Sequence, residues 1–160
     1  MVIYILRHGI AEDAPHGGSD ADRALTAEGK QKLRDILERA RAAGVRPSVI
    51  LTSPLKRAVQ TAEIAAATLE CKSEPVKSKA LLPEAPPHGV WTELRRQEAD
   101  ELLVAGHEPQ LSQLVGFLLG CRALRFDFKK GALVRIDLEK AAAEPHGTLK
   151  WILTPKLAAR

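Results

Sequence analysis

Residues 2–9 have the sequence VIYILRHG, an apolar run that stops abruptly at an arginine and a histidine. Its β-branched and aromatic side chains are typical of a strand that helices cover on both faces. Arg7 and His8 come at the carboxyl end, where open α/β sheets gather their ligands, and Gly9 lets the backbone turn away. The run therefore predicts a central strand with a candidate anion site at its end.

Length and composition favour one folded domain over residues 1–160. Of the 160 residues, 45% are hydrophobic and 28% are charged, which is ordinary for a soluble globular protein. Lys and Arg number 24 against 20 Asp and Glu, and the pI is about 9.2, a balance that suits an anionic substrate or a phosphorylated or acidic partner. Aromatic residues make up only 4% and are not interleaved with a basic run, so no nucleic-acid partner is expected.

Nothing in the sequence predicts a membrane segment. The longest apolar run has only a few residues, far short of the roughly 20 that span a bilayer. Arg7 and His8 interrupt the first apolar run, so it does not resemble a signal peptide, and a cytoplasmic location is expected. Cys71 and Cys121 lie far apart and in no metal-ligand spacing, which favours two reduced thiols without a role.

Two further apolar strands also lead into helices. Residues 49–51 are followed by Ser53 and Pro54, a natural N-cap and a natural first helical residue, so a helix is expected from Pro54 to about residue 69. Residues 102–105 form another short strand, and the apolar stripe over residues 111–118 predicts a helix after it.

The segments between these strands predict two more helices and two loops. A polar loop is expected over residues 10–22, followed by a helix that Thr26 caps and that ends near residue 43. Prolines predict an irregular loop over residues 82–89, and a helix is expected over residues 91–99.

The last third of the chain changes to a period of two. Residues 124–128 alternate between apolar and polar, and residues 132–138 and 148–153 predict two strands joined by a turn at 144–147. These two strands are expected to form an antiparallel hairpin. Together the elements predict an α/β fold, a three-layer α/β/α sandwich around a mostly parallel sheet.

Four cationic or imidazole side chains come to one edge of this predicted sheet: Arg7, His8, Arg57 and His107. Arg57 stands in the first turn of its helix, where the macrodipole disfavours a cation unless it serves a bound phosphate. Two guanidiniums can hold a phosphoryl group bidentately, and a protonated second imidazole would add a donor, which leaves His8 free as nucleophile. Zinc is the competing interpretation, but the arginines would repel a metal and no third ligand stands beside either histidine, so neither metal nor cofactor is expected.

Five ordered segments resemble the histidine phosphatase superfamily. They are Leu6-Arg7-His8-Gly9, Arg23-Ala24-Leu25-Thr26 with Gly29, Ser53-Pro54 with Arg57 and Gln60-Thr61, Leu82-Pro83-Glu84, and Gly106-His107-Glu108-Pro109. The short length, the lack of an inserted lid, Lys130-Gly131-Ala132 and the closing residues 151–155 are most similar to the SixA-type phosphohistidine phosphatases. The resemblance implies a phosphoglycerate mutase-like fold.

The resemblance also implies a mechanism with a covalent phosphohistidine. His8 would attack phosphorus in line, and Arg7, Arg57 and His107 would surround the equatorial oxygens in the transition state. Water would then release phosphate.

Three other residues have roles implied by the resemblance. Arg23 would help to fix the pocket or the substrate, and the backbone amide of Glu108 could donate to the phosphate. Glu84 matches the position that often protonates the leaving group, which an ester needs and phosphohistidine needs less. The alternative for Glu84 is a loop carboxylate near the rim.

We therefore expect a cytoplasmic, metal-independent phosphatase of signal transduction that acts on phosphohistidine in a protein, such as a phosphotransfer domain. A small-molecule phosphomonoesterase for a sugar phosphate or nucleotide is the first alternative, and a phosphate-binding module without turnover is the second. Lys129 and Lys130 stand just before the strand at 132–138, where they reach either the substrate or only solvent.

Overall fold

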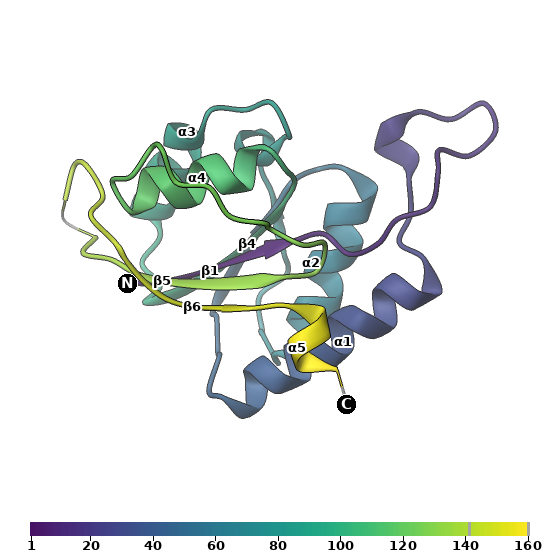
Figure 1. Cartoon of the computed structure of the whole chain (residues 1–160), viewed down its shortest axis with the longest axis horizontal. Coiled ribbons are helices and arrows are strands. Elements are labelled where there is room, and N and C mark those ends of the chain that lie inside the picture. Colours follow the sequence, from purple (N-terminus) through teal and green to yellow (C-terminus); the bar gives the residue numbers. More distant parts are fainter. Residues whose placement is uncertain (141, 160) are drawn as a thin grey trace.

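A six-stranded sheet forms the middle layer of the molecule (Figure 1). The computed structural model describes residues 1–140 and 142–159. The strands are ordered β3-β2-β4-β1-β5-β6 across the sheet. Their bounds are β1 Val2–Arg7, β2 Val49–Thr52, β3 Val76–Lys77, β4 Glu101–Gly106, β5 Leu133–Asp137 and β6 Thr148–Leu153.

The first four strands run parallel, and the last two are antiparallel to their neighbours. β1 pairs with β4, β4 with β2 and β2 with β3 in parallel, whereas β5 is antiparallel to β1 and β6 is antiparallel to β5. This confirms the mostly parallel sheet with an antiparallel C-terminal hairpin. Because parallel strands share one direction, the carboxyl ends of β1, β2 and β4 lie at the same edge of the sheet.

Helices cover both faces of the sheet. α1 Ala27–Ala42, α2 Lys56–Thr68 and the short α5 Pro155–Ala158 lie on one face, and α3 Pro87–Arg96 and α4 Gln110–Leu118 lie on the other (Figure 1). Two single 3-10 turns, η1 Asp20–Asp22 and η2 Lys79–Leu81, precede α1 and α3. The predicted α/β/α sandwich is therefore confirmed. Among the described residues, no helix is both long enough and apolar enough to cross a bilayer.

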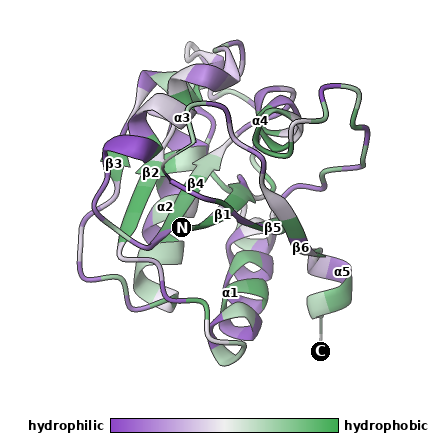
Figure 2. Cartoon of the chain, turned by 90° about the vertical axis from the view of Figure 1, so that its left-hand side faces the viewer, coloured by the Kyte–Doolittle hydropathy of each residue, from purple (hydrophilic) through white to green (hydrophobic). Residues whose placement is uncertain are grey.

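Strand β1 contributes to two apolar cores, because successive side chains of a strand point to opposite faces. Ile3 and Ile5 belong to the core under α3 and α4, whereas Tyr4 and Leu6 belong to the core under α1 and α2. All four side chains are buried. Figure 2 shows the hydrophobic strands enclosed between the helical layers. The two-sided burial predicted for this strand is confirmed, and it fixes the position of the basic residues that follow.

Helix α1 begins where the sequence predicts, and α2 does not. Thr26 is the N-cap of α1, and its side-chain oxygen accepts a hydrogen bond from a first-turn amide at 2.9 Å. The expectation that Ser53 caps a helix beginning at Pro54 was wrong by two residues, because the N-cap of α2 is Leu55. The Ser53 hydroxyl instead accepts from the Leu55 amide at 3.3 Å, which closes a turn before the helix begins.

Two other segments differ from the prediction. Residues 82–89 are not wholly irregular, because α3 begins at Pro87, where the missing amide hydrogen of proline is no loss. That helix ends at Arg96, earlier than the expected residue 99. Residues 124–128 alternate in sequence but form no strand, although Phe128 is buried in the core under α3 and α4.

Candidate active site

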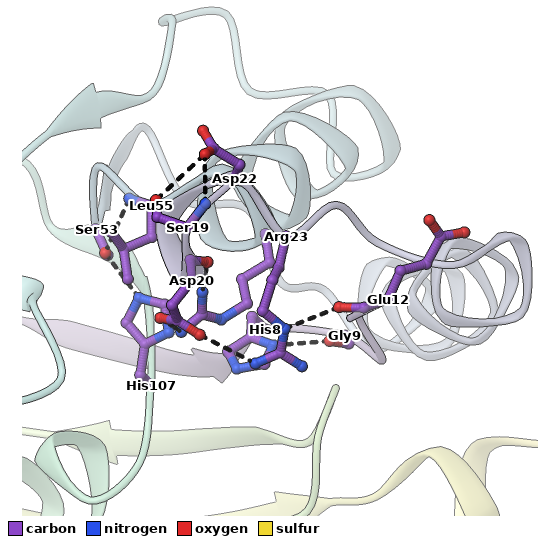
Figure 3. Close-up of polar contacts among 11 residues, drawn as sticks. His8, Gly9, Glu12, Ser19, Asp20, Asp22, Arg23, Ser53, Leu55 and His107 are labelled. Atoms are coloured by element: carbon purple, nitrogen blue, oxygen red, sulfur yellow. Dashed lines mark hydrogen bonds and ion pairs between the residues drawn. The ribbon is translucent and has the colours of Figure 1, made fainter. Parts of the chain in front are cut away.

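His8 follows β1 directly and has one ring nitrogen fixed by its own neighbour (Figure 3). Its Nδ1 lies 2.7 Å from the carbonyl oxygen of Gly9. Since a carbonyl can only accept, Nδ1 carries the proton and Nε2 keeps its lone pair. The residue is 6% exposed. His8 is therefore oriented with a basic nitrogen free for reaction.

The surroundings of His8 hold it in the uncharged form. Burial, together with the nearby charges of Arg57, Arg7 and Lys130, lowers the pKa of His8 to about 4, against the hydrogen bond to Gly9. At neutral pH the imidazole is neutral, as a nucleophile must be.

His107 follows β4 and faces His8, with the two ring centroids 5.1 Å apart. Its Nε2 lies 2.7 Å from the hydroxyl oxygen of Ser53, and its Nδ1 is buried with no hydrogen-bond partner. The tautomer in which Ser53 donates to Nε2 leaves Nδ1–H as an unused donor. Burial lowers the pKa of His107 to about 3, with His8 and Arg57 adding to the shift. The second imidazole is thus neutral here, and the approach of a phosphate dianion would favour its protonation.

Arg57 lies in the first turn of α2, with 5% of its surface exposed. Its Nη1 donates to the Asp20 backbone oxygen at 3.0 Å, and its Nη2 donates to the Asp20 carboxylate at 3.1 Å. Its Nε is buried and has no hydrogen-bond partner among the described residues. A cation in a first helical turn is unfavourable with respect to the helix dipole, so its burial there indicates a role with anions.

Arg7 is the last residue of β1 and has a similar unused donor. Its Nη1 donates to the backbone oxygen of Phe128 at 2.6 Å, while its Nε is buried with no partner. Burial lowers the pKa of Arg7, and the carboxylates of Glu108 and Asp127 act in the opposite direction. Arg7 and Arg57 therefore both present unsatisfied N–H donors, and both lie near enough to His8 to lower its pKa.

Residues of α2 tie the end of β1 to the helix that carries Arg57. The Gly9 amide donates to the Thr61 hydroxyl oxygen at 3.2 Å, and the Thr61 hydroxyl donates to the Arg57 carbonyl at 2.7 Å. The Gln60 side chain accepts from the Leu25 amide at 2.8 Å. The Gln-Thr pair found in the sequence thus connects the residue after His8, the helix that carries Arg57 and the segment before α1.

Arg23 lies on the loop before α1 and reaches the arginine site through an acidic residue. Its Nε donates to the Glu12 carbonyl at 2.8 Å, and its Nη1 pairs with the Asp20 carboxylate at 3.2 Å (Figure 3). The same carboxylate pairs with Arg57. Arg23 is therefore connected to the four central groups through Asp20, and it makes no hydrogen bond to His8.

Glu108 and Glu84 are placed differently from each other. The Glu108 carboxylate accepts from the Ser112 amide at 2.8 Å and from its hydroxyl at 2.6 Å, so this side chain caps α4. No backbone acceptor pairs with the Glu108 amide within the described part of the chain, which leaves that N–H available. Glu84 is exposed and forms no hydrogen bond or ion pair with any described residue. The structure does not bring Glu84 into contact with the other site residues.

Asp20 is a residue of the site that the sequence patterns did not reveal. The pKa of this carboxyl is lowered by its hydrogen bonds and ion pairs with Arg23 and Arg57, and these outweigh its desolvation. It sits in the single turn η1, which is held by the Asp22 carboxylate accepting from the Ser19 amide at 2.9 Å. The available signal was an acidic residue three positions before Arg23. Asp20 shows that the Arg57 guanidinium accepts an anionic partner.

The donor set does not resemble a metal centre. Within residues 1–140 and 142–159, no group of three or more His, Cys, Asp or Glu side chains is arranged to hold a metal ion. Around His8 the charged neighbours are arginines and a lysine, which favour anions.

Comparisons with known proteins give one family. Residues 3–113 match the model of the histidine phosphatase superfamily (branch 1). An uncharacterized protein from Picosynechococcus is 33% identical over 150 residues, which cover 91% of this chain and 90% of that protein. A probable phosphoglycerate mutase from Enterobacter is 41% identical over 75 residues, 44% of this chain and 33% of that protein.

Solved structures give the same fold. The protein histidine phosphatase SixA, solved with tungstate, superposes with a TM-score of 0.86 at 28% identity, covering 98% of both chains. An α-ribazole-5′-phosphate phosphatase described as putative, from Escherichia coli, superposes with a TM-score of 0.72 at 19% identity over 97% of both chains. The predicted phosphoglycerate mutase-like fold is confirmed by these superpositions.

Proposed function

The chain belongs to branch 1 of the histidine phosphatase superfamily, and we propose that it removes the phosphoryl group from phosphohistidine in a protein substrate. One observation carries the proposal: a neutral, oriented imidazole on His8 lies near two arginines, Arg7 and Arg57, each of which has a buried Nε–H without a partner among the described residues. The similarity of almost the whole chain to SixA supports phosphohistidine as the substrate.

In the first step, His8 accepts the phosphoryl group. The Nε2 lone pair forms a bond to phosphorus while the P–N bond of the substrate breaks. The substrate ring, protonated on its other nitrogen, keeps that electron pair and leaves as a neutral imidazole. His8 becomes a phosphorylated imidazolium, whose Nδ1–H is stabilised by the Gly9 carbonyl 2.7 Å away.

The charged oxygens of the transition state are stabilised by donors already in place. Arg7 and Arg57 offer their free Nε–H groups, and the Glu108 amide adds an uncharged donor. His107 contributes a further N–H. Because these groups are held by β1, α2 and β4, little reorganisation is needed when charge develops.

In the second step, water attacks the phosphorylated His8. The bond between phosphorus and Nε2 breaks, its electron pair returns to the imidazole, and the proton of the attacking water passes to solvent or to phosphate. Inorganic phosphate leaves and the neutral histidine is restored. Neither of these two steps requires a residue that protonates an alkoxide.

The exposed position of Glu84 supports phosphohistidine over an ester. An ester needs an acid beside the leaving oxygen, whereas an imidazole leaves with a proton that it can carry already. Glu84 forms no hydrogen bond or ion pair within the described residues that would aim it at the site. Two more expectations belong to the proposal: a cytoplasmic role in signal transduction, and hydrolysis without a metal, since the arginines supply the positive charge.

A substrate panel tests the proposal. In the presence of EDTA, the wild type is expected to hydrolyse a histidine-phosphorylated peptide with a kcat/KM about 100-fold above that for an aryl phosphate or a phosphoserine peptide. Glu84→Gln should leave the phosphohistidine rate within about twofold, because no step uses this carboxyl.

Other outcomes of the panel would replace the proposal. Faster hydrolysis of the esters, together with a large loss in Glu84→Gln, would indicate a small-molecule phosphomonoesterase. No turnover with measurable phosphate binding would indicate a binding module.

A further inference from the structure

A cleft of about 520 Å³ opens beside Arg7. Its walls come from the loop after β1, from α1, from the loop before β5 and from the start of α5. Figure 1 shows α5 lying beside α1, below the end of β6. The charged residues that line this cleft are Arg7, Lys32, Asp127, Lys129, Lys130 and Lys156.

The basic character of the molecule is concentrated in this cleft. Five cations face one carboxylate there, an excess of four positive charges. The whole chain has 24 Lys and Arg against 20 Asp and Glu, which is the same excess. The charges outside the cleft therefore sum to zero, and the cleft is a local concentration of positive charge that can attract an anion.

The loop that carries two of the lysines is fastened to the nucleophile strand. The Gly131 amide donates to the carbonyl oxygens of both Arg7, at 3.1 Å, and His8, at 3.0 Å. Gly131 has a φ of +74°, which favours glycine, and a side chain there would come within 3.3 Å of Pro155. The Arg7 side chain holds the same loop through its bond to the Phe128 carbonyl. The cleft is thus continuous with the reaction site.

Three of the four lysines are available to a ligand, whereas Lys32 pairs with Glu28 on the same helix at 2.9 Å. Lys130 and Lys156 are exposed and form no hydrogen bond or ion pair with the described residues. Lys129 pairs with Asp127 at 2.7 Å, with side chains 64% and 73% exposed. A surface pair of this kind contributes little to stability, so it can exchange for an incoming carboxylate.

We propose that this cleft binds carboxylates that flank the phosphohistidine of a protein substrate, and so selects phosphoproteins with an acidic surface. The inference rests on the proposed function. Single ammonium groups on flexible stems, spread over separate elements, suit several separated carboxylates. One compact second phosphate would instead favour converging donors, such as an arginine fork or adjacent backbone amides.

Two matched peptides and two matched variants test this assignment. The peptides carry one phosphohistidine followed by three glutamates or by three glutamines. The wild type is expected to favour the glutamate peptide about tenfold in kcat/KM, mostly through KM and less at high salt. The double variant Lys129→Gln/Lys156→Gln should lose this preference and keep the rate on the glutamine peptide.

The control variant is Lys72→Gln/Lys150→Gln, which removes the same charge from exposed positions outside the cleft. It should keep the preference. The proposal is overturned if the wild type shows no preference, if the cleft variant retains it, or if the control variant loses it equally. It also fails if the cleft variant lowers activity only on small molecules with a second phosphate. Failure of the proposed function can be distinguished from failure of this inference, because the wild type would then hydrolyse neither peptide.

Discussion

His8 and His107 stay uncharged at neutral pH, and the nearby Arg7 and Arg57 help to keep them so. For both histidines, burial is the largest cause of the low pKa, and the positive neighbours add to it. In the proposed reaction a protonated His8 could not attack phosphorus, so the arginines proposed to bind phosphate would also keep His8 in its reactive form. The positive charges of Arg7 and Arg57 would therefore serve two purposes, the binding of phosphate and the maintenance of a neutral His8.

This arrangement makes stability depend on pH. The pKa of His107 is about 3 in the folded chain, whereas the pKa of a histidine in an unfolded chain is about 6.5. As the pH falls below ~6.5, the unfolded chain binds a proton that the folded chain does not, so the free energy of unfolding decreases until the folded pKa is reached. Between about pH 7 and 4.5 the wild type should lose more free energy of unfolding than His107→Gln does. We expect a difference of about 1–2 kcal/mol, which urea unfolding at the two pH values would measure.

His16→Gln is the control for this experiment, because His16 is an exposed loop residue. Its pH dependence should equal that of the wild type. Equal slopes for His107→Gln and His16→Gln would show that the burial of His107 has no energetic consequence.

Among the single residues, the main site groups could be predicted and their partners could not. Arg7, His8, Arg57 and His107 stand at strand ends or a helix start, which local patterns reveal. The contact between Asp20 and Arg57 joins positions 37 residues apart, and no periodicity encodes it. The neutral state of His107 also depends on burial by the folded chain, so the sequence suggested a protonated donor instead.

At the scale of elements, the loop after β1 lies directly on α1. Gly29, in the first turn of α1, is where they meet, and a side-chain carbon there would lie 2.3 Å from the Ile10 carbonyl oxygen. Backbone atoms cannot yield as a flexible side chain would. This close approach explains why residue 29, three positions after Leu25-Thr26, is a glycine.

We expect Gly29→Ala to destabilise the chain by about 2 kcal/mol and to lower phosphatase activity, because the loop must shift next to His8. Thermal unfolding and kcat/KM would measure both effects. Gly89→Ala in α3 is the matched control, since the nearest atom there is 3.5 Å away and alanine favours a helix. It should raise stability slightly, and a similar loss in both variants would contradict the steric explanation.

The start of α2 shows why element boundaries were harder to predict than elements. Ser53 and Pro54 are a strong local signal for a helix start. The Ser53 hydroxyl, however, lies 2.7 Å from Nε2 of His107, which follows another strand, β4. A tertiary contact thus uses the side chain that local rules assign to the cap, and α2 begins two residues later.

At the scale of the whole molecule, strand order explains why the site lies where it does. β1 and β4 are neighbours, and Arg7 is aligned with Gly106, so His8 and His107 emerge side by side. The chain leaves β1 toward α1 on one face and leaves β4 toward α4 on the other. Connections that diverge in this way open a crevice at the carboxyl edge, which is the usual ligand site of such sheets.

The layer architecture was predictable because two-sided burial of β1 and the hairpin pattern both leave clear signals. Strand order was not, since nothing local in the sequence places β4 between β1 and β2. That residues 1–160 form a single domain stays a prediction.

The central claim is that His8 carries the phosphoryl group during turnover, and trapping the intermediate tests it most directly. The enzyme would be mixed with a histidine-phosphorylated peptide, quenched in alkali to preserve the P–N bond, and digested with trypsin for mass spectrometry. We expect phosphate on the peptide of residues 8–23, located at His8 by fragmentation, and no label or turnover in His8→Ala. Turnover by His8→Ala, or a label at His107 in its place, would contradict the account.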